Sequence, residues 1–318
     1  MRLTLYFLFI VFSVPFYAQK TRSVVFYNVE NYFDTIDGTN DDAEFLPSSE
    51  NNWNSEKYFA KRNHINQVFD LMPNPLFIGM CEIENESVLR DLNAHSESRK
   101  SFGIVHEESP DARGIDVAIM YDSSSVKLIS SGKLRFVLPN QTEPSTRDIL
   151  WGKFSRKKDT IFVMVNHWPS RRGGQLESEP LRLEAAKNAR NFIDSVLNAN
   201  ANAKIVLMGD LNDYPTDKAP QLIDEKLNPM ITHESGEFGG SHNYKETWDV
   251  LDHIFVSPSL QNSKKGFKVC SSSGKIHSFP FLLTEYKGQI VPFRTYGGST
   301  YLGGYSDHLP VSIELSWP

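Results

Sequence analysis

Residues 206–213 read Val-Leu-Met-Gly-Asp-Leu-Asn-Asp, and this stretch is the most informative one for the fold. A short apolar run, typical of a buried strand, ends at Gly209, where the backbone can turn tightly. Asp210 and Asn212 follow, and on an extended segment their side chains point the same way. The two side chains could bind a hard cation such as Mg²⁺ or Ca²⁺. Alternatively, the Asn212 amide could donate a hydrogen bond to a phosphoryl oxygen. A plain Asx turn after a strand is the alternative.

The same arrangement, an apolar strand followed by polar side chains, recurs along the chain. Four predicted strands end directly in side chains that can bind metal or move a proton. These side chains are Glu30 and Asn31, Glu82, Asn166 and His167, and Asp210. Ligand sites in α/β architectures gather at such strand ends. We therefore interpret these positions as one convergent site.

The other regular elements follow from periodicity. Short apolar runs rich in β-branched or aromatic residues predict strands at residues 23–29, 76–81, 115–121, 161–166, 204–208, 253–256 and 311–315. Helical spacing predicts helices at 53–71 and 179–199, the second with Pro180 at its start. Interleaved strands and helices indicate an α/β or α+β fold. No linker interrupts them, so we expect one catalytic domain over residues 19–318.

Two aspartates, Asp307 and Asp252, are candidates for pairing with a histidine. Asp307 and His308 lie just before the last predicted strand, and a carboxylate beside an imidazole can hold metal and accept a proton. A solvated loop pair is the alternative. Asp252 lies inside an apolar strand signal, where a carboxylate without a partner is costly. His308 would be a natural partner, but an Asp bonded to backbone at a strand edge fits equally well.

Three arginines are candidate phosphate contacts. Arg171 follows His167 on a glycine-containing loop, and Arg113 and Arg147 each stand at a strand start. Guanidinium groups match phosphate oxygens in a bidentate way. Arg113 and Arg147 also fit ordinary surface ion pairs, and Arg171 fits an ordinary solvent loop. Asp116 is a candidate for holding the tautomer of His167.

The bulk composition is that of a globular protein without a polyanion-binding character. The 318 residues are 40% hydrophobic and 23% charged, and the formal net charge is −6. An acidic chain without a basic block binds nucleic acid poorly by charge alone. A nuclease that contacts phosphate locally through metal and a few arginines is still compatible with this charge.

The first residues have the pattern of a secretory signal peptide. Arg2 precedes an uncharged, apolar run at residues 3–19, and the small Ala18 marks the expected cleavage site. The segment 1–18 is therefore assigned to the signal peptide, with a retained membrane anchor as the alternative, and we expect a secreted or periplasmic protein. Cys81 and Cys270 could pair there, but a small buried hydrophobe is the preferred interpretation of Cys81.

Taken together, the motifs resemble those of the endonuclease/exonuclease/phosphatase superfamily, the DNase I-like group. They occur in the family's order over nearly the whole mature chain, as a secreted bacterial-type member would have them. The resemblance rests on residues 27–31, 82–85, 166–168, 209–213, 251–254 and 306–308. It implies an α+β, four-layer sandwich in which two mainly antiparallel sheets lie face to face between helices.

The resemblance also implies roles for the residues. Glu82 would be the principal metal ligand, with Asn28 and Asp307 near the same ion, which would be Mg²⁺, Mn²⁺ or Ca²⁺. Asp210 would orient the attacking water or hold a second metal, and Asn212 would donate to the scissile phosphate.

For the proton transfers, the resemblance makes His308 a general base or a stabiliser of the phosphorane, with Asp252 behind it. His167 would be the second histidine, and Arg147 would contact phosphate. The implied activity is metal-dependent phosphodiester hydrolysis by a secreted endonuclease or phosphodiesterase, acting as a monomer without a stable protein partner.

Three other functions are alternatives. A sphingomyelinase-like phospholipid phosphodiesterase is suggested by the apolar segment 279–283 and the aromatic segment 296–305, which would contact a membrane unless both pack on the sandwich. A sugar or inositol phosphate phosphatase could use the same site, and an inactive relative could act as a binding protein. Residues 37–54 and 264–305 are the expected specificity elements.

Overall fold

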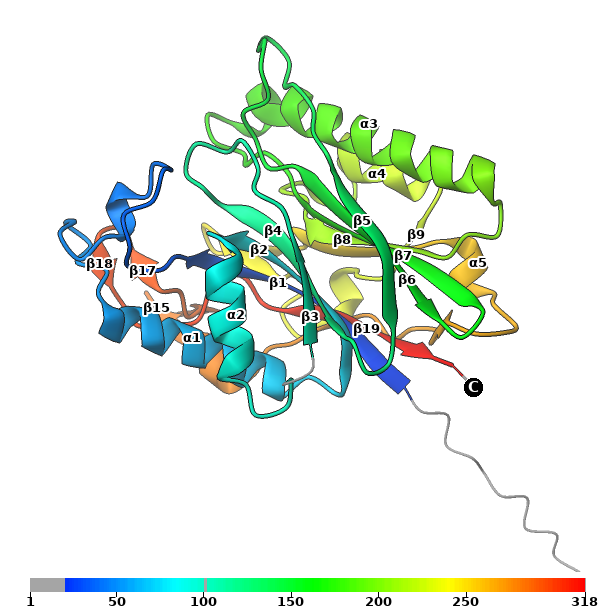
Figure 1. The fold of residues 1–318 in the computed structure, drawn as a ribbon. Coiled ribbons are helices and arrows are strands. Elements are labelled where there is room, and N and C mark those ends of the chain that lie inside the picture. The colour runs from blue at the N-terminus through cyan, green and yellow to red at the C-terminus, as the bar shows by residue number, and fades with distance from the viewer. Residues whose placement is uncertain (1–20, 100–101, 318) are drawn as a thin grey trace, which may run out of the picture.

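The computed structural model describes residues 21–99 and 102–317. Figure 1 shows two sheets packed against each other, with helices on the outside of both. The predicted signal peptide and its cleavage site lie outside the described residues. None of the helices in the described ranges is both long enough and apolar enough to cross a membrane.

The first sheet has the strand order β13-β19-β1-β2-β4-β3, and β14 also pairs with β19. All its pairs are antiparallel except β1 with β2, which is parallel. Its strands are β1 (Thr21–Tyr32), β2 (Pro75–Ile83), β3 (Phe102–His106), β4 (Asp116–Asp122), β13 (Lys268–Val269), β14 (Lys275–Ile276) and β19 (Val311–Ser316).

The second sheet has the order β5-β6-β7-β8-β12-β9. Only β7 and β8 run parallel. Its strands are β5 (Lys127–Leu134), β6 (Ile149–Arg156), β7 (Asp159–His167), β8 (Ile205–Asp210), β9 (Asn228–Pro229) and β12 (Asp252–Val256).

Helices and small hairpins complete the molecule. The α-helices are α1 (Ser55–Asp70), α2 (Glu86–Ala94), α3 (Gln175–Ala199), α4 (Lys218–Asp224) and α5 (Pro258–Gln261), and the 3-10 helices are η1 (Ala43–Phe45), η2 (His233–Ser235) and η3 (Pro280–Leu282). Three two-stranded hairpins stand apart from the sheets: β10–β11 (His242–Tyr244, Thr247–Asp249), β15–β16 (Leu283–Tyr286, Gln289–Pro292) and β17–β18 (Tyr296–Gly297, Thr300–Tyr301).

Two apolar cores hold the layers together. One core fills the space between the sheets and continues under α1 and α2. Its fully buried members include Val24, Ile78, Val163 and Met208. The other lies between the second sheet and α3, around Ala185 and its neighbours. Because strand side chains alternate between faces, each sheet supplies residues to both of its sides. The predicted four-layer α+β sandwich is confirmed.

The predicted elements are found with small shifts at their ends. All seven predicted strands are present, and the two predicted helices correspond to α1 and α3. Helix α3 begins four positions earlier than predicted, so Pro180 lies in its second turn rather than at its start. Cys81 and Cys270 are both free, so they do not pair, and Cys81 is buried as the preferred interpretation expected.

The apolar segment 279–283 and the aromatic segment 296–305 pack on the sandwich. Phe279, Phe281 and Tyr296 are partly buried against the main core, and Leu282 is fully buried in it. The Phe281 ring lies 4.9 Å from that of Tyr305, centroid to centroid. These side chains therefore contribute to the core of the protein rather than to an exposed apolar loop.

Candidate active site

Strand register brings the predicted residues to one end of the sandwich. In the parallel pair β1–β2, Asn28 lies beside Cys81, the neighbour of Glu82. In the second sheet His167 is the register partner of Asp210, and Asp210 is that of Asp252. The two sheets stack with these ends together, since β1 contacts both β8 and β12.

Glu82 and Asn28 form the first part of the site. The Asn28 amide donates to Glu82 Oε1 at 3.3 Å and to Asp210 Oδ2 at 3.1 Å, and the Asn31 backbone N–H donates to Glu82 Oε2 at 2.9 Å. Glu82 has a φ of 62° and Asn31 one of 55°, which is unusual for residues with a side chain. Such strained backbone is concentrated at functional sites, where the surrounding structure holds it in place.

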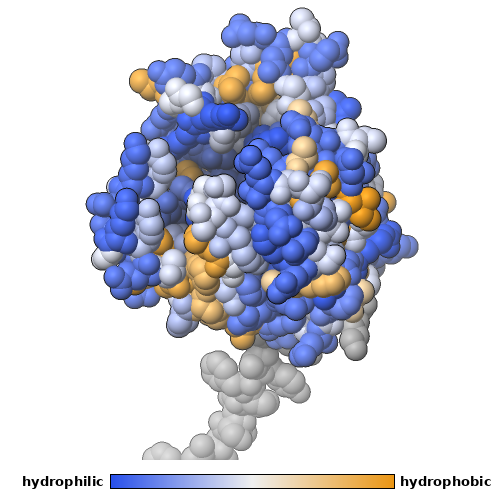
Figure 2. All heavy atoms as spheres, turned by 90° about the vertical axis from the view of Figure 1, so that its left-hand side faces the viewer, coloured by the Kyte–Doolittle hydropathy of each residue, from blue (hydrophilic) through white to orange (hydrophobic). Residues whose placement is uncertain are grey.

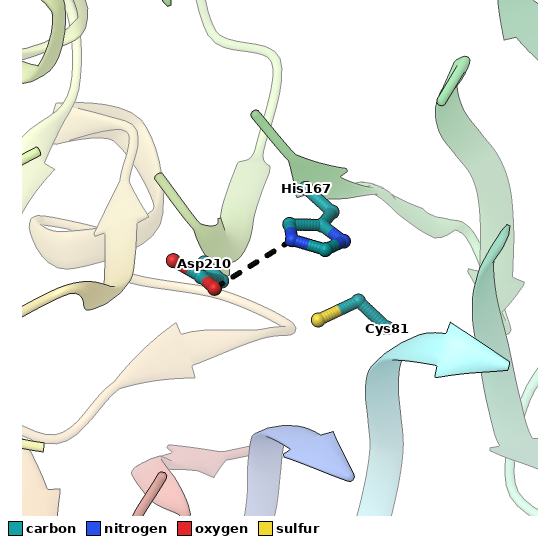
Figure 3. A group of neighbouring side chains, drawn as sticks. All are labelled: Cys81, His167 and Asp210. Atoms are coloured by element: carbon teal, nitrogen blue, oxygen red, sulfur yellow. Dashed lines mark ion pairs between the residues drawn. The ribbon is translucent and has the colours of Figure 1, made fainter. Parts of the chain in front are cut away.

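Figure 3 shows His167, Asp210 and Cys81 pointing toward one another from the ends of β7, β8 and β2. His167 Nε2 lies 3.7 Å from Asp210 Oδ2 and 3.9 Å from Glu82 Oε1. Burial, reinforced by the nearby Arg147 and Arg113, holds the pKa of His167 well below its usual range. The imidazole is therefore neutral and can accept a proton or a hydrogen bond.

Cys81 is the apolar floor of the site. Burial raises the pKa of its thiol well above the usual value, and the carboxylates of Asp210 and Glu82 add to the effect. A thiolate, not a thiol, binds metal or attacks as a nucleophile. The Cys81–His167–Asp210 group therefore brings its three side chains together around a protonated thiol.

His308 and Asp252 form a buried pair. His308 Nδ1 lies 2.7 Å from Asp252 Oδ2, which also accepts a hydrogen bond from the Ser241 hydroxyl, and His308 Nε2 lies 3.7 Å from Asp210 Oδ2. Burial alone would lower the pKa of His308, but Asp252 and Asp210 raise it well above the usual value. The partnership expected for Asp252 is thus present, in preference to a purely backbone-bonded Asp.

A second charged group adjoins this pair. Arg294, from the loop between β16 and β17, donates to Glu30 Oε1 at 3.2 Å and to Asp307 Oδ2 at 3.0 Å. The Thr295 backbone N–H also donates to Glu30, at 2.6 Å. Beneath them, the buried ammonium of Lys61 donates to the Thr295 hydroxyl and to a backbone carbonyl.

The donor set fits a hard divalent cation. Four carboxylates, those of Glu30, Glu82, Asp210 and Asp307, gather here, and carboxylate oxygens suit Mg²⁺, Mn²⁺ and Ca²⁺. The Asn28 amide nitrogen faces two of them, while its oxygen accepts from the Glu30 N–H at 3.0 Å. Their negative charge is incompletely balanced. Burial, with like charge nearby, raises the pKa of Glu30 and of Asp210 to about 7 each. A bound cation would supply the missing positive charge.

Sequence reasoning missed three residues of the site. His242 forms an isolated bridge to His308, and the two rings lie 4.7 Å apart. Its side chain forms a compact group with Asp307 and His308. Lys61 and Arg294 were also missed, because no motif surrounds them. Glu30 was visible as a strand-end acid, but nothing in its neighbours indicated a role.

The three predicted arginines differ in their surroundings. Arg147 is buried, donates to Asp111 at 2.9 Å and to the Trp168 carbonyl at 2.7 Å, and so braces the loop after His167 rather than facing solvent. Arg171 donates to the Asn212 carbonyl and pairs with Asp217, so it also holds a loop. Only Arg113, whose side chain is 56% exposed, leaves a guanidinium largely accessible.

Two further expectations are wrong in detail. Asn212 has a φ of 51°, so the segment after Asp210 is not extended, and its amide donates to the Trp168 carbonyl. Asp116 does not hold His167. It lies 3.2 Å from His106 instead, because β4 pairs with β3 on that side, and His167 Nδ1 has no hydrogen-bond partner among the described residues.

The family assignment follows from comparison with known proteins. The profile of the Endonuclease/Exonuclease/phosphatase family matches residues 23–317, nearly the whole described chain. The chain belongs to this family of phosphoester hydrolases. A search of curated proteins finds no match.

Solved structures share the fold at low sequence identity. A family member from Bacteroides thetaiotaomicron is 18% identical with a TM-score of 0.59, covering 95% of this chain and 100% of its own. The mannosyl-6-phosphatase of the same organism is 17% identical with a TM-score of 0.58 and coverages of 93% and 100%. TDP2 of D. rerio, complexed with a single-strand DNA product, is 13% identical with a TM-score of 0.59 and coverages of 93% and 99%.

Proposed function

We propose that this protein is a divalent-metal-dependent phosphodiesterase. The observation that supports this most directly is that Asp210 and Asp307 each form a compact group with His308, which is paired with Asp252. Glu82 shares the Asn28 amide with Asp210. A phosphodiester is anionic, so much of the barrier to its hydrolysis is charge repulsion. A site that combines oxygen ligands for a cation with an oriented imidazole addresses both the charge and the proton transfer.

The residues of the site have distinct proposed roles in cation binding and in proton transfer. Glu82, Asn28 and Asp307 hold the cation, which supplies Lewis-acid stabilisation of the phosphoryl oxygens when bound. Asp252 fixes the orientation of the His308 imidazole through the 2.7 Å contact at Nδ1, which leaves Nε2 directed at the centre. Asp210 accepts from the Asn28 amide and lies 3.7 Å from both His167 and His308, where it can orient an attacking water.

Phosphate contacts come from a smaller set than the sequence predicted. Arg113 is the accessible arginine near His167 and is proposed to bind a phosphoryl oxygen. Arg147 and Arg171 act indirectly by holding the loops that carry Trp168 and Asn212. Phosphatase activity on a sugar phosphate is the second candidate, favoured by the likeness to a mannosyl-6-phosphatase.

A turnover screen tests the proposal. The purified protein is incubated with supercoiled plasmid, bis-(p-nitrophenyl) phosphate, p-nitrophenyl phosphate and sphingomyelin, each with Mg²⁺, Mn²⁺, Ca²⁺ or EDTA. We expect metal-dependent cleavage of a diester that is lost in His308→Ala and retained in His95→Ala, an exposed histidine on the far end of α2. Cleavage of monoesters alone would replace the diesterase with the phosphatase. Cleavage unaffected by His308→Ala would exclude this centre.

Export is a separate part of the proposal. The apolar leader at residues 1–18 supports secretion to the outside or to the periplasm. Amino-terminal sequencing of the exported protein should give Gln19 as its first residue. Recovery of the chain only in the cytoplasm with Met1 still present would contradict export.

A further inference from the structure

A cleft of about 890 Å³ adjoins the candidate active site. It lies between the tips of the three hairpins β10–β11, β15–β16 and β17–β18, and Asp307 forms part of its wall. Figure 2 views this side of the molecule, where the surface is hollowed and bordered mainly by hydrophilic side chains. Small-molecule sites occupy roughly 300–1,000 Å³, so the cleft has the size of such a site.

The cleft is continuous with the catalytic residues. Hairpin β10–β11 carries both Asn243 and Tyr244, which line the cleft, and His242, which bridges to His308. Arg294 also lines the cleft and donates to Asp307 at 3.0 Å. The cleft therefore opens beside Asp307, where the organic group of a bound phosphoester can enter it.

The charge of the lining does not suit a polyanion. The lining carries no net charge, because its three cations are matched in number by three carboxylates: Lys245, Lys287 and Arg294 against Glu246, Glu285 and Asp307. Arg294 pairs with Asp307, whereas each lysine ammonium lies 5.2 Å from the ring centre of the tyrosine that precedes it. Nucleic-acid grooves neutralise several backbone phosphates with unpaired Lys and Arg. A cleft with balanced charges, in a chain whose net charge is −6, selects an organic group that carries little charge of its own.

The uncharged lining is suited to a ring. Tyr244 and Tyr286 are 61% and 60% exposed, although each stands at a tight hairpin turn beside the cleft. Tyrosine offers an apolar face and a polar edge at low conformational cost. Asn243 and Gln289 add neutral donors and acceptors nearby. The matching chemistry is a ring with an apolar face and a hydrogen-bonding edge, as in a pyranose sugar or a nucleobase.

We propose that the cleft between the three hairpin tips is a substrate subsite that binds the ring-bearing organic group of a small phosphoester. This inference rests on the proposed function, because it takes the phosphate to be held at the Glu82–Asp307–His308 centre. Tyr244 and Tyr286 are its principal contacts, and they determine specificity without taking part in the chemical step.

Calorimetric binding of non-hydrolysable phosphonates tests the subsite independently of turnover. The probes, with Mg²⁺ present, are the analogues of a hexose 6-phosphate and of a nucleoside 5′-monophosphate, and the analogue of glycerol 3-phosphate is the ringless reference. We expect at least one ring-bearing probe to bind about tenfold or more tightly than the reference. The tighter of the two ring-bearing probes identifies the ring as a sugar or a base.

The variants then locate the effect. Tyr286→Ala and Tyr244→Ala should each remove most of the preference for the ring, Tyr286→Phe should keep it, and Phe59→Ala should have no effect. Phe59 is a matched control because its ring, on α1, is 47% exposed and lies outside the cleft. Equal binding of ring-bearing and ringless probes, or tighter binding of a ten-nucleotide strand than of the nucleotide analogue, would overturn the subsite.

Failure of the subsite and failure of the proposed function are distinguishable. If the protein cleaves diesters but binds all the phosphonates equally, the subsite is wrong and the function stands. If the ring preference is present and lost in Tyr286→Ala while no phosphoester is cleaved with any metal, the subsite stands and the function is wrong.

Discussion

The pKa values of the two histidines in the site are shifted in opposite directions by their neighbours. His167 is buried near Arg147 and Arg113, which lowers its pKa, whereas His308 is buried against Asp252 and Asp210, which raises its pKa. Environments that separate the pKa values of two titratable groups are the usual way in which one site provides both an acid and a base. The Asp252–His308 contact is therefore the pair interaction on which proton transfer at this site depends most.

Asp252→Asn should lower kcat by about 10²–10⁴ and leave KM nearly unchanged. The amide keeps the volume of the carboxylate but removes the charge that orients the His308 imidazole. Steady-state kinetics on the preferred ester measures this. Asp224→Asn, the same change in α4, is the control. A similar loss in both variants would show that Asp252 has no special role.

Arg294 would compete with a bound cation, since its guanidinium already pairs with Asp307 and Glu30. Arg294→Gln should therefore lower the Mn²⁺ concentration at half-saturation several-fold, because the carboxylates lose a competing positive charge. Electron paramagnetic resonance of free Mn²⁺ during titration measures it. Weaker Mn²⁺ binding in the variant would mean that Arg294 supports the ligands rather than competing with the cation.

At the scale of elements, the pairing of β7 with β8 positions two of the proposed catalytic residues, His167 and Asp210. Gly209 lies so close to β7 that an added Cβ would meet the Asn166 carbonyl oxygen at 2.3 Å. The glycine is thus required by close packing of two backbones, and its next neighbour in the chain is Asp210. The tight-turn role predicted from the sequence is not what the structure shows, since β8 continues through Asp210.

Gly209→Ala should lower the free energy of unfolding by about 1–3 kcal/mol and reduce kcat as well. The two strands must separate, which moves Asp210 away from His167. Urea denaturation and kinetics on the same preparation measure both effects. Gly132→Ala is the control, because the nearest atoms that its Cβ would meet belong to the side chain of Trp151, at 3.0–3.2 Å, and not to a backbone. Wild-type stability in Gly209→Ala would contradict the close packing.

Elements were predictable from the sequence where one or both faces are buried. Strands β2 and β8 are apolar up to Glu82 and Asp210, so they were found, whereas β5 is largely exposed and carries Ser-Ser-Gly in its middle. Helix α2 was missed because it has nine residues. The strand-end residues were found for a physical reason: a polar side chain directly after a buried strand stands out against its neighbours.

Contacts between distant segments could not be predicted in this way. Lys61 belongs to α1 and Arg294 to the loop between β16 and β17, and both reach Glu30 or its partner Thr295 only after the chain has folded. The same holds for Asp116, whose partner is decided by strand order rather than by sequence. His242 is positioned by a bridge to His308 that no local pattern encodes.

At the scale of the whole molecule, several buried histidines make stability depend on pH. His277 Nε2 forms a 2.8 Å hydrogen bond with the Ser312 hydroxyl, and burial lowers the pKa of His277 to about 4. His253 is lowered to about 4 for the same reason. A histidine with a lowered pKa takes up a proton more readily in the unfolded chain. Its contribution to stability is complete above pH 6.5 and is lost as the pH falls toward 4.

His277→Gln should therefore flatten the acid side of the stability profile. Between pH 7 and pH 4 the wild type should lose on the order of 3 kcal/mol more than the variant, because glutamine does not titrate. Urea unfolding at half-unit pH steps measures the difference. Parallel curves over this range would show that His277 binds protons equally in the folded and unfolded states.

In the proposed function, carboxylates at the converging strand ends hold a cation that phosphoester hydrolysis requires. The most direct test of this claim is the rate of bis-(p-nitrophenyl) phosphate hydrolysis as a function of Mg²⁺ in the wild type and in Glu82→Gln, with Glu86→Gln in the next helix as the control. We expect a saturable Mg²⁺ dependence, abolished by EDTA, that Glu82→Gln shifts or lowers at least a hundredfold and Glu86→Gln leaves intact. Hydrolysis that persists in EDTA, or that is unaffected by Glu82→Gln, would contradict the claim.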